Sequence, residues 1–196
     1  MSKINEEKIH FTEQQTIIIK EKDYIGRILD IGGGGEGIIS QLYGDKVVAI
    51  DLSEEELKEA PKNDSLKIIM DVRQLKFLDE QFDIVTSFFT FMYINNKDLN
   101  QVFKEIKRVL KPGGKLLIWG LKIPKKTERD KEIFAARLKV EFKNKSIETG
   151  YGTIWEDNEQ DIDKFIEIAR QNEMKVINQK QGKQYFYLEL KIDGNK

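Results

Sequence analysis

At 196 residues, with 39% hydrophobic and 34% charged side chains, the chain has the size and composition of one soluble globular domain, which we expect to span residues 1–196. The 33 basic and 34 acidic side chains nearly cancel, which argues against a nucleic-acid partner, and the absence of cysteine excludes disulfides, thiolate nucleophiles and thiolate metal sites. No apolar run approaches the roughly 20 residues needed to cross a membrane, and the chain opens without an apolar leader, so we expect a cytoplasmic protein with no membrane partner.

The first segment, residues 1–24, is predicted to be a helical flap. The four residues from Thr12 to Gln15 have the pattern of a capping box, which satisfies free backbone N–H groups at the start of a helix. They lead into three isoleucines, so we expect a short helix that packs over the rest of the domain. His10, the only histidine, is a candidate general base if this flap covers a site, and is otherwise a surface residue.

From residue 27 onward, apolar runs with strand spacing alternate with helical or crossover segments. Ser53 and Glu56 form a further capping box, which predicts the start of one of these helices. The runs that predict buried strands are residues 27–31, 46–51, 66–71, 82–87 and 115–119. Because such crossovers are right-handed, they predict an α/β fold with a mostly parallel, doubly wound sheet of seven strands once the C-terminal pair is added.

That C-terminal pair is predicted from residues 175–177 and 185–192, which are too close in sequence to pair other than antiparallel. Before it, residues 121–160 are less regular, and we expect an insertion or lid there. Apolar residues alternate from Ala136 to Phe142, and a turn is indicated at Asn144 and Lys145. These features predict an inserted β-hairpin.

A glycine cluster, residues 32–37, follows the first strand and opens a helix. Its backbone can approach a ligand closely, because glycine has no side chain. The cluster contains the Gly-x-Gly-x-x-Gly pattern of dinucleotide-binding proteins, and Asp51 follows at the distance of a ribose-binding acid, so an NAD(P)-dependent oxidoreductase is one hypothesis. Asp30 lies where dinucleotide-binding strands usually carry an apolar residue, and an acid there fits a cationic ligand better.

The run Leu29-Asp30-Ile31-Gly32-Gly33-Gly34 resembles the glycine-rich motif of class I, Rossmann-like, S-adenosylmethionine-dependent methyltransferases, which is usually Leu-Asp-Ile-Gly-x-Gly. The resemblance covers most of residues 25–120, including the strand 82–85 and the turn 110–114. It implies S-adenosylmethionine as the cofactor, S-adenosylhomocysteine as its product, and loop amides that meet the methionine carboxylate. One departure is Glu36, where the family commonly has a further glycine.

By the same resemblance, Asp51 holds the two ribose hydroxyls, with Leu52 against the adenine. Asp71 lies near the adenine amino group, with Val72 beside it, although Asp71 could instead be a plain turn residue. Ser87 ends the fourth strand, at the edge of the ligand crevice. The implied cofactor-binding residues are Asp30, Gly32, Gly33, Gly34, Asp51, Leu52, Asp71, Val72 and Ser87.

The resemblance implies direct in-line attack of an acceptor on the sulfonium methyl, with no obligatory catalytic residue and no metal. The small size of the chain favours a small-molecule acceptor, and the segment from Thr86 to Phe89 lacks the Asn/Asp-Pro-Pro-Tyr pattern of adenine methylation. Residues 122–145 carry nine basic and four acidic side chains, which form either a basic lid over an anionic acceptor or a solvated face. Tyr151 and Trp155 either line an acceptor pocket or pack the hairpin, and a non-catalytic S-adenosylmethionine-binding protein is a further alternative.

Overall fold

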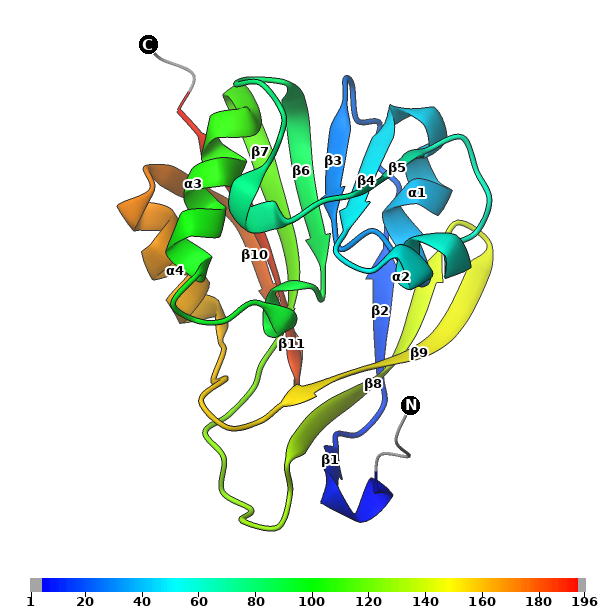
Figure 1. Ribbon diagram of the computed structural model, residues 1–196, viewed down its shortest axis with the longest axis vertical. Helices are drawn as coiled ribbons and strands as arrows, with labels where there is room; N and C mark the ends of the chain where they lie inside the picture. The colour runs from blue at the N-terminus through cyan, green and yellow to red at the C-terminus, as the bar shows by residue number, and fades with distance from the viewer. Residues whose placement is uncertain (1–4, 194–196) are drawn as a thin grey trace.

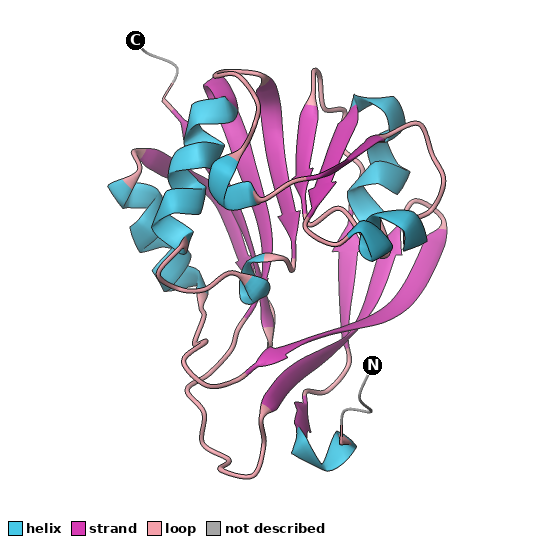
Figure 2. Ribbon diagram, viewed as in Figure 1, coloured by secondary structure: helices cyan, strands magenta, loops and turns pink. Residues whose placement is uncertain are grey.

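A computed structural model describes residues 5–193 of the chain. Its core is a seven-stranded sheet with helices on both faces, and a second sheet of four strands lies below one end of the first (Figure 1). Figure 2 shows the two layers of strands and the helices that flank the larger sheet. No helix in the described part of the chain is long and apolar enough to cross a membrane.

The larger sheet has the strand order β10-β11-β7-β6-β3-β4-β5. The five strands from β7 to β5 in this order run parallel to one another. β11 pairs antiparallel with both β7 and β10. The strands are β3 (Ile28–Ile31), β4 (Val47–Asp51), β5 (Leu66–Ile69), β6 (Phe82–Phe88), β7 (Leu110–Leu121), β10 (Met174–Gln181) and β11 (Tyr185–Ile192). This arrangement confirms the predicted fold class and its reversed C-terminal strands.

One boundary differs from the prediction. β7 begins directly at Leu110, so the predicted break over residues 111–114 lies inside the strand. The pairing register of β7 against β6 shifts there, and Gly113 has a φ of +76°, which accommodates the irregularity.

Four α-helices connect the strands: α1 (Ile38–Tyr43), α2 (Glu54–Glu59), α3 (Leu99–Val109) and α4 (Ile162–Gln171). α2 begins at the predicted cap, since the amide of Glu56 donates to the hydroxyl of Ser53 at 3.1 Å. α3 and α4 cover one face of the sheet, where Phe103 and Phe165 share a core with its strands. α1 and the second sheet cover the other face.

The predicted N-terminal helix is wrong, because this segment forms the strands β1 (Ile9–Phe11) and β2 (Gln15–Ile19). The hydroxyl of Thr12 donates to the carbonyl of Glu13 instead of capping a helix. Ile17 and Ile19 are buried whereas Ile18 is exposed, which is the alternation of a strand with one covered face. The β-branched isoleucines favour this extended backbone, and its core-facing contacts outweigh the capping pattern.

The predicted hairpin is confirmed as β8 (Ile133–Phe142) and β9 (Lys145–Ile154), which pair antiparallel over their full lengths. β1 and β2 pair in parallel with successive parts of β8, and this completes the second sheet, which the sequence did not indicate. Alternate side chains of β8, among them Leu138 and Val140, join a core with α1 and β7. The hairpin is therefore packed onto the domain and forms a fixed wall of it.

Candidate active site

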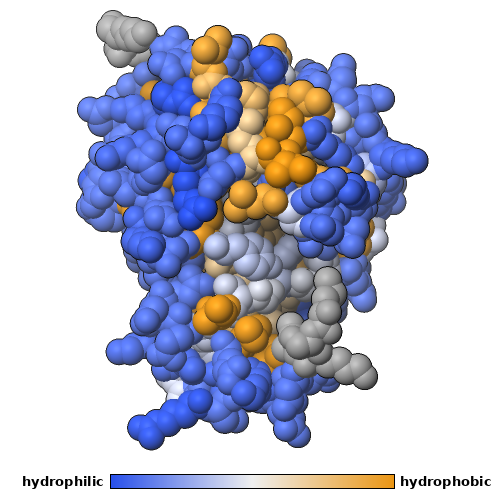
Figure 3. Space-filling view, in the orientation of Figure 1, coloured by the Kyte–Doolittle hydropathy of each residue, from blue (hydrophilic) through white to orange (hydrophobic). Residues whose placement is uncertain are grey.

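A cavity of about 770 Å³ lies where β3, β4 and β6 end. That volume is within the range of roughly 300 to 1,000 Å³ that is typical of small-molecule sites. The order of the parallel strands reverses between β3 and β6, and open α/β sheets bind ligands at the carboxyl ends of strands at such a point. In the space-filling view the mouth is a recessed area of intermediate hydropathy (Figure 3). The cavity walls come from the loop after β3, from α2, from the segment after β6 and from β9.

The glycine loop, residues 32–37, joins β3 to α1 and forms one wall of the cavity. Gly32 has a φ of +70°, a conformation that glycine adopts at little cost. A Cβ atom on Gly34 would lie 2.5 Å from the Cβ of Glu56, and one on Gly33 would lie 2.7 Å from the Cβ of Ala49. The loop thus approaches α2 and β4 at distances that only glycine permits.

Several backbone amides of the glycine loop anchor it to its neighbours. Gly32 and Gly33 donate to the carbonyl of Ile50 at 2.8 and 3.0 Å, and Gly35 donates to the carbonyl of Glu56 at 2.9 Å. These amides hold the loop against β4 and α2. The sequence led us to expect that loop amides meet a methionine carboxylate. In this arrangement the amides of Gly32 and Gly33 are already engaged by Ile50 and do not make that contact.

Asp30 lines the cavity from the end of β3 and is only 2% exposed. Its Oδ1 atom accepts a hydrogen bond of 2.7 Å from the hydroxyl of Thr86. Burial, and secondarily the charge of Asp51, raise the pKa of Asp30 to about 7, against the opposing effect of the Thr86 hydrogen bond. A carboxyl group in this state gains its charge readily when a cation binds nearby.

Asp51 lies at the end of β4 and also lines the cavity. Its Oδ1 atom accepts from the amide of Ser53 at 2.9 Å, while its Oδ2 atom lies 3.0 Å from the position of a Cβ on Gly34. Leu52, which is 64% exposed, and Val72 line the cavity beside it. One carboxylate oxygen of Asp51 thus lies beside Gly34, where the end of β4 meets the glycine loop.

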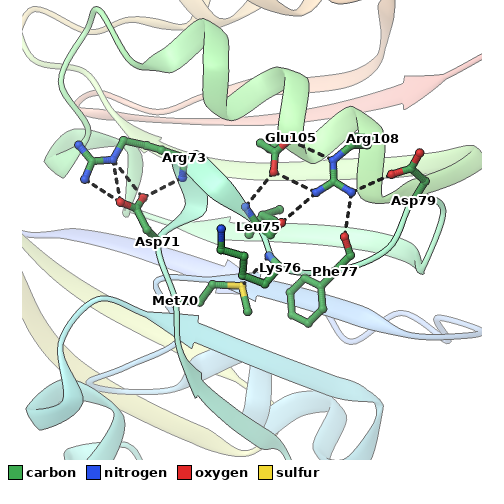
Figure 4. Close-up of polar contacts among 9 residues, drawn as sticks. All are labelled: Met70, Asp71, Arg73, Leu75, Lys76, Phe77, Asp79, Glu105 and Arg108. Carbon is green, nitrogen blue, oxygen red and sulfur yellow. Dashed lines mark hydrogen bonds and ion pairs between the residues drawn. The ribbon is translucent and has the colours of Figure 1, made fainter.

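Asp71 is not among the residues that line the cavity. Figure 4 shows its carboxylate held by Arg73, whose Nε and Nη2 atoms donate at 2.9 and 2.7 Å to Oδ2. The amide of Arg73 also donates to Oδ1 at 2.8 Å, so Asp71 caps the short helix η3 (Val72–Gln74). These hydrogen bonds to Arg73 lower the pKa of Asp71 below its ordinary value. The geometry of Asp71 agrees with the alternative interpretation, in which it is a plain turn residue.

Ser87 is also absent from the cavity lining, although it lies at the predicted strand end. Its side chain is fully buried, and its Oγ atom has no hydrogen-bond partner among the described residues. Phe88 and Thr90, which follow it, line the cavity instead. Phe89 has a φ of +56°, a strained value for a side chain of its size, and such strain clusters at functional sites.

Two lining residues that were not predicted as cofactor-binding residues form a hydrogen-bonded pair across the cavity wall. The hydroxyl of Tyr151 on β9 donates to Oε2 of Glu36 in the glycine loop at 2.9 Å, and the hydroxyl of Thr149 donates to Oε1. Burial and the charge of Glu36 raise the pKa of Tyr151 well above its ordinary value. The phenol therefore stays protonated and acts as a donor. The missing glycine at Glu36 was the sequence signal for this contact.

His10 and Trp155 do not line the cavity. Nδ1 of His10 lies 2.7 Å from a carboxylate oxygen of Glu128, and its ring stacks on Phe134 with the centroids 5.3 Å apart. The indole Nε1 of Trp155 donates to the carbonyl of Pro124 at 2.8 Å, and its side chain is buried. Both residues therefore pack the second sheet, whereas Tyr151 is the member of the predicted aromatic pair that reaches the site.

The side chains that line the cavity give it one sign of charge. No lysine, arginine or histidine of residues 5–193 lines it. Among the basic side chains of residues 122–145, Lys143 donates to the carbonyl of Leu42, and Lys126 pairs with Glu156. Lys145 donates to the side chain of Gln41, which does line the cavity. The solvated-face interpretation fits these contacts better than a basic lid. The acids that line the cavity are Asp30, Glu36, Asp51, Glu56 and Glu59.

Comparison with known families and proteins gives a match in sequence. Residues 29–118 match the family model of the Methyltransferase domain. Sterol 4-C-methyltransferase strm-1 of Caenorhabditis elegans is 33% identical over 103 residues, which are 47% of this chain and 30% of that protein. Ubiquinone/menaquinone biosynthesis C-methyltransferase UbiE of Shewanella frigidimarina is 32% identical over 112 residues, or 50% of this chain and 44% of that protein. The chain thus matches less than half of the length of these relatives.

Solved structures give a match in fold over most of the chain. A S-adenosylmethionine-dependent methyltransferase of Methanosarcina mazei has a TM-score of 0.61 at 18% identity and covers 85% of this chain and 92% of its own. The [4+2]-cyclase SpnF has a TM-score of 0.63 at 13% identity, with coverage of 87% and 75%. Since these proteins are named for different reactions, the fold alone does not define the reaction.

The sequence match shows a Methyltransferase domain over residues 29–118, and the fold is that of S-adenosylmethionine-dependent methyltransferases, which agrees with the resemblance seen in the sequence. The cofactor named for the Methanosarcina mazei structure is S-adenosylmethionine. The described cavity fits this group: Asp51 offers a carboxylate oxygen to a diol, and the lining acids suit a cofactor with a sulfonium and an ammonium. The absence of side chains at Gly33 and Gly34 leaves the space in which such a ligand would pass the loop.

Proposed function

We propose that the protein transfers a methyl group from S-adenosylmethionine to a small-molecule acceptor. The observation that carries the proposal is the position of Asp51, whose Oδ2 atom accepts no hydrogen bond from residues 5–193 and lies beside Gly34 in a cavity at the switch point of the sheet. A carboxylate there accepts hydrogen bonds from both hydroxyls of a ribose, and these bonds are charge-assisted. The family match over residues 29–118 supports the same activity.

We assign other parts of the cofactor to the remaining lining residues. Leu52 and Val72 provide apolar contact for the adenine beside Asp51, and Asp30 provides a carboxyl group for a positive charge at the other side of the glycine loop. Asp71 and Ser87 lie outside the lining, so the proposal assigns no cofactor contact to either.

The bound cofactor supplies an electrophilic methyl group on a good leaving group, so the protein is required mainly to align the acceptor and exclude water. β9, the end of β6 and the segment after β6 enclose the proposed acceptor side of the cavity through Ile147, Tyr151, Phe88 and Ile94. A cavity of about 770 Å³ suits a small molecule beside the cofactor. The named relatives act on a sterol and in ubiquinone or menaquinone biosynthesis, which agrees with a small-molecule acceptor.

The test is a thermal-shift and calorimetric titration with S-adenosylmethionine, S-adenosylhomocysteine and NAD(H). A ligand that binds only the native state raises the melting temperature with concentration. We expect stabilisation by the first two compounds and none by NAD(H). A response to NAD(H) alone would assign the glycine loop to a dinucleotide and overturn the proposal, whereas binding without turnover of any acceptor would favour a non-catalytic role.

A further inference from the structure

A carboxylate of the cavity lining is fixed in place next to β9. Glu36 lines the cavity from the glycine loop. It accepts one hydrogen bond from Tyr151 and one from Thr149, each on a separate oxygen, and both donors belong to β9. A carboxylate oxygen accepts more than one hydrogen bond, so each oxygen of Glu36 keeps a free site for a ligand.

Aromatic rings line the same cavity as this carboxylate. They belong to Phe88, Tyr93 and Tyr151. The ring of Tyr151 stacks on Phe89 with centroids 5.2 Å apart and an interplanar angle of 8°, and Phe88 meets Phe89 edge to face at 4.9 Å. These contacts fix the orientation of the rings. Aromatic faces combined with a carboxylate are a preferred environment for an organic cation.

The acidic side chains that line the cavity disfavour an anionic acceptor. Five acids line it, and no basic side chain of residues 5–193 does. S-adenosylmethionine carries one net positive charge, so it compensates only one of these acids. An acceptor with a phosphate or carboxylate group would meet like charge at several points, and no lining side chain of the described residues would pair with it.

A separate observation at the inner wall points to a cation as well. Asp30 is 2% exposed and lines the cavity, yet the only hydrogen bond to its carboxylate within residues 5–193 is the one from Thr86 to Oδ1. Its Oδ2 atom lies 2.9 Å from the position of a Cβ on Gly33, at the base of the glycine loop. This oxygen is not one of the fully buried unpartnered atoms among the described residues, so it borders the cavity and is open to a hydrogen-bond donor on a ligand.

We propose that the acceptor is a cationic amine, methylated on nitrogen, and that Glu36 is the specificity-determining residue that binds its ammonium group. This inference rests on the proposed methyl transfer. The ammonium first loses one proton to water. The nitrogen lone pair then forms a bond to the methyl carbon as the carbon–sulfur bond breaks and its electron pair stays on sulfur. The products are the methylated ammonium and S-adenosylhomocysteine.

The experiment uses three probes of similar shape and different charge: benzylamine, benzyl alcohol and sodium benzoate, together with butylamine as a smaller amine. The full chain is first titrated with S-adenosylhomocysteine by calorimetry. The loaded protein is then titrated with each probe by NMR, with Glu36→Gln as the test variant and Glu148→Gln as the control. Glu148 is an exposed acid on β9 that does not line the cavity.

We expect the two amines to bind at the cavity and benzoate not to bind. Glu36→Gln should weaken amine binding by roughly fivefold to tenfold, as loss of one partly buried charge partner predicts. The same variant should weaken amine binding more than it weakens S-adenosylhomocysteine binding, because the amine pairs directly with the charge that is lost. Glu148→Gln should match the unmutated protein. Tyr151→Phe, which keeps the ring and removes one donor to Glu36, gives a second variant with a smaller loss of amine binding.

The outcomes separate the two proposals. If S-adenosylhomocysteine does not bind, the proposed methyl transfer itself fails. If it binds while benzoate or benzyl alcohol binds as tightly as benzylamine, if neither amine binds, or if Glu36→Gln leaves amine binding unchanged, the amine proposal is overturned and methyl transfer stands.

Discussion

The hydroxyl of Tyr151 donates a hydrogen bond of 2.9 Å to Glu36 and thereby joins β9 of the second sheet to the glycine loop of the first. These residues are far apart in sequence, and the contact depends on the hairpin being packed onto the domain. The same tyrosine stacks on Phe89, which immediately follows β6. One side chain thus connects the three parts of the chain that enclose the cavity.

Replacement of Tyr151 by phenylalanine tests this connection. The variant keeps the stacking surface and removes the hydroxyl, so we expect the free energy of unfolding to fall by about 1 kcal/mol. Amide hydrogen exchange of residues 145–154 should become faster, since the hairpin loses a bond to the glycine loop. Chemical denaturation and exchange measured by mass spectrometry check both effects. Unchanged exchange in β9 would show that the hairpin is held by its core contacts alone.

Asp51 at the end of β4 and Asp71 after the end of β5 should contribute differently to cofactor binding. Asp51→Asn should weaken binding of S-adenosylmethionine by roughly tenfold or more, because it removes a charge-assisted acceptor from the ribose. Glu54→Gln is the matched control, since Glu54 is an exposed acid that pairs with Lys58. Calorimetry measures both affinities. Equal affinity of Asp51→Asn and the unmutated protein would contradict the ribose assignment.

Asp71→Asn should leave the affinity for S-adenosylmethionine within about twofold, because the carboxylate is engaged by Arg73 and an asparagine can still cap η3. The same calorimetric titration measures this variant. A loss as large as that of Asp51→Asn would return Asp71 to the adenine site that the family resemblance implied.

The sequence predicted those parts of the molecule in which local pattern and tertiary packing agree. The alternation from Ala136 to Phe142 predicted the hairpin, and β8 has that burial pattern. The N-terminal segment failed for the opposite reason. A four-residue capping pattern suggested a helix, but pairing of β2 with β8 buries Ile17 and Ile19, and no local signal indicates a strand partner so distant in sequence.

The residues of the candidate site also fall into those that the sequence indicated and those that it did not. Asp30, Asp51 and the loop glycines line the cavity, and the signals that indicated them were the glycine motif after the first predicted strand, the acid at the end of the next strand and the family resemblance. The sequence does not decide whether Tyr151 lines a pocket or packs the hairpin, because its position depends on how the hairpin packs onto the domain. Asp71 has the expected position in sequence, but its side chain is turned by Arg73 two residues later, a local contact that the family pattern does not contain.

Gly34→Ala tests the close packing of the glycine loop against α2. The added Cβ would lie 2.5 Å from the Cβ of Glu56, so the loop or the helix must move. We expect a loss of about 1 to 3 kcal/mol in the free energy of unfolding. Binding of S-adenosylmethionine should fall by more than about tenfold, since the shifted loop narrows its path.

Gly44→Ala serves as the control for Gly34→Ala. Gly44 has a φ of +52° and nothing within 4 Å of its Cβ position, and it lies outside the cavity lining. This variant should cost about 1 to 3 kcal/mol of stability through backbone strain alone and leave cofactor affinity unchanged. If both glycine variants weaken binding equally, the effect on binding comes from general destabilisation and not from the loop geometry.

The buried carboxyl group of Asp30 should make stability depend on pH. Its pKa is raised to about 7, mainly by burial, whereas in the unfolded chain it returns to about 4. Between these values the folded state holds a proton that the unfolded state has lost, so the free energy of unfolding falls as the pH rises from about 4 to about 7 and levels off above that. Asp30→Asn removes the titrating group and keeps a side chain that can accept from Thr86. Denaturation from pH 5 to pH 8 should therefore show a shallower decline for the variant than for the unmutated protein, and parallel curves would contradict a raised pKa. Saturating S-adenosylmethionine should reduce the decline of the unmutated protein, because a bound cation favours the charged carboxylate and lowers its pKa in the folded state.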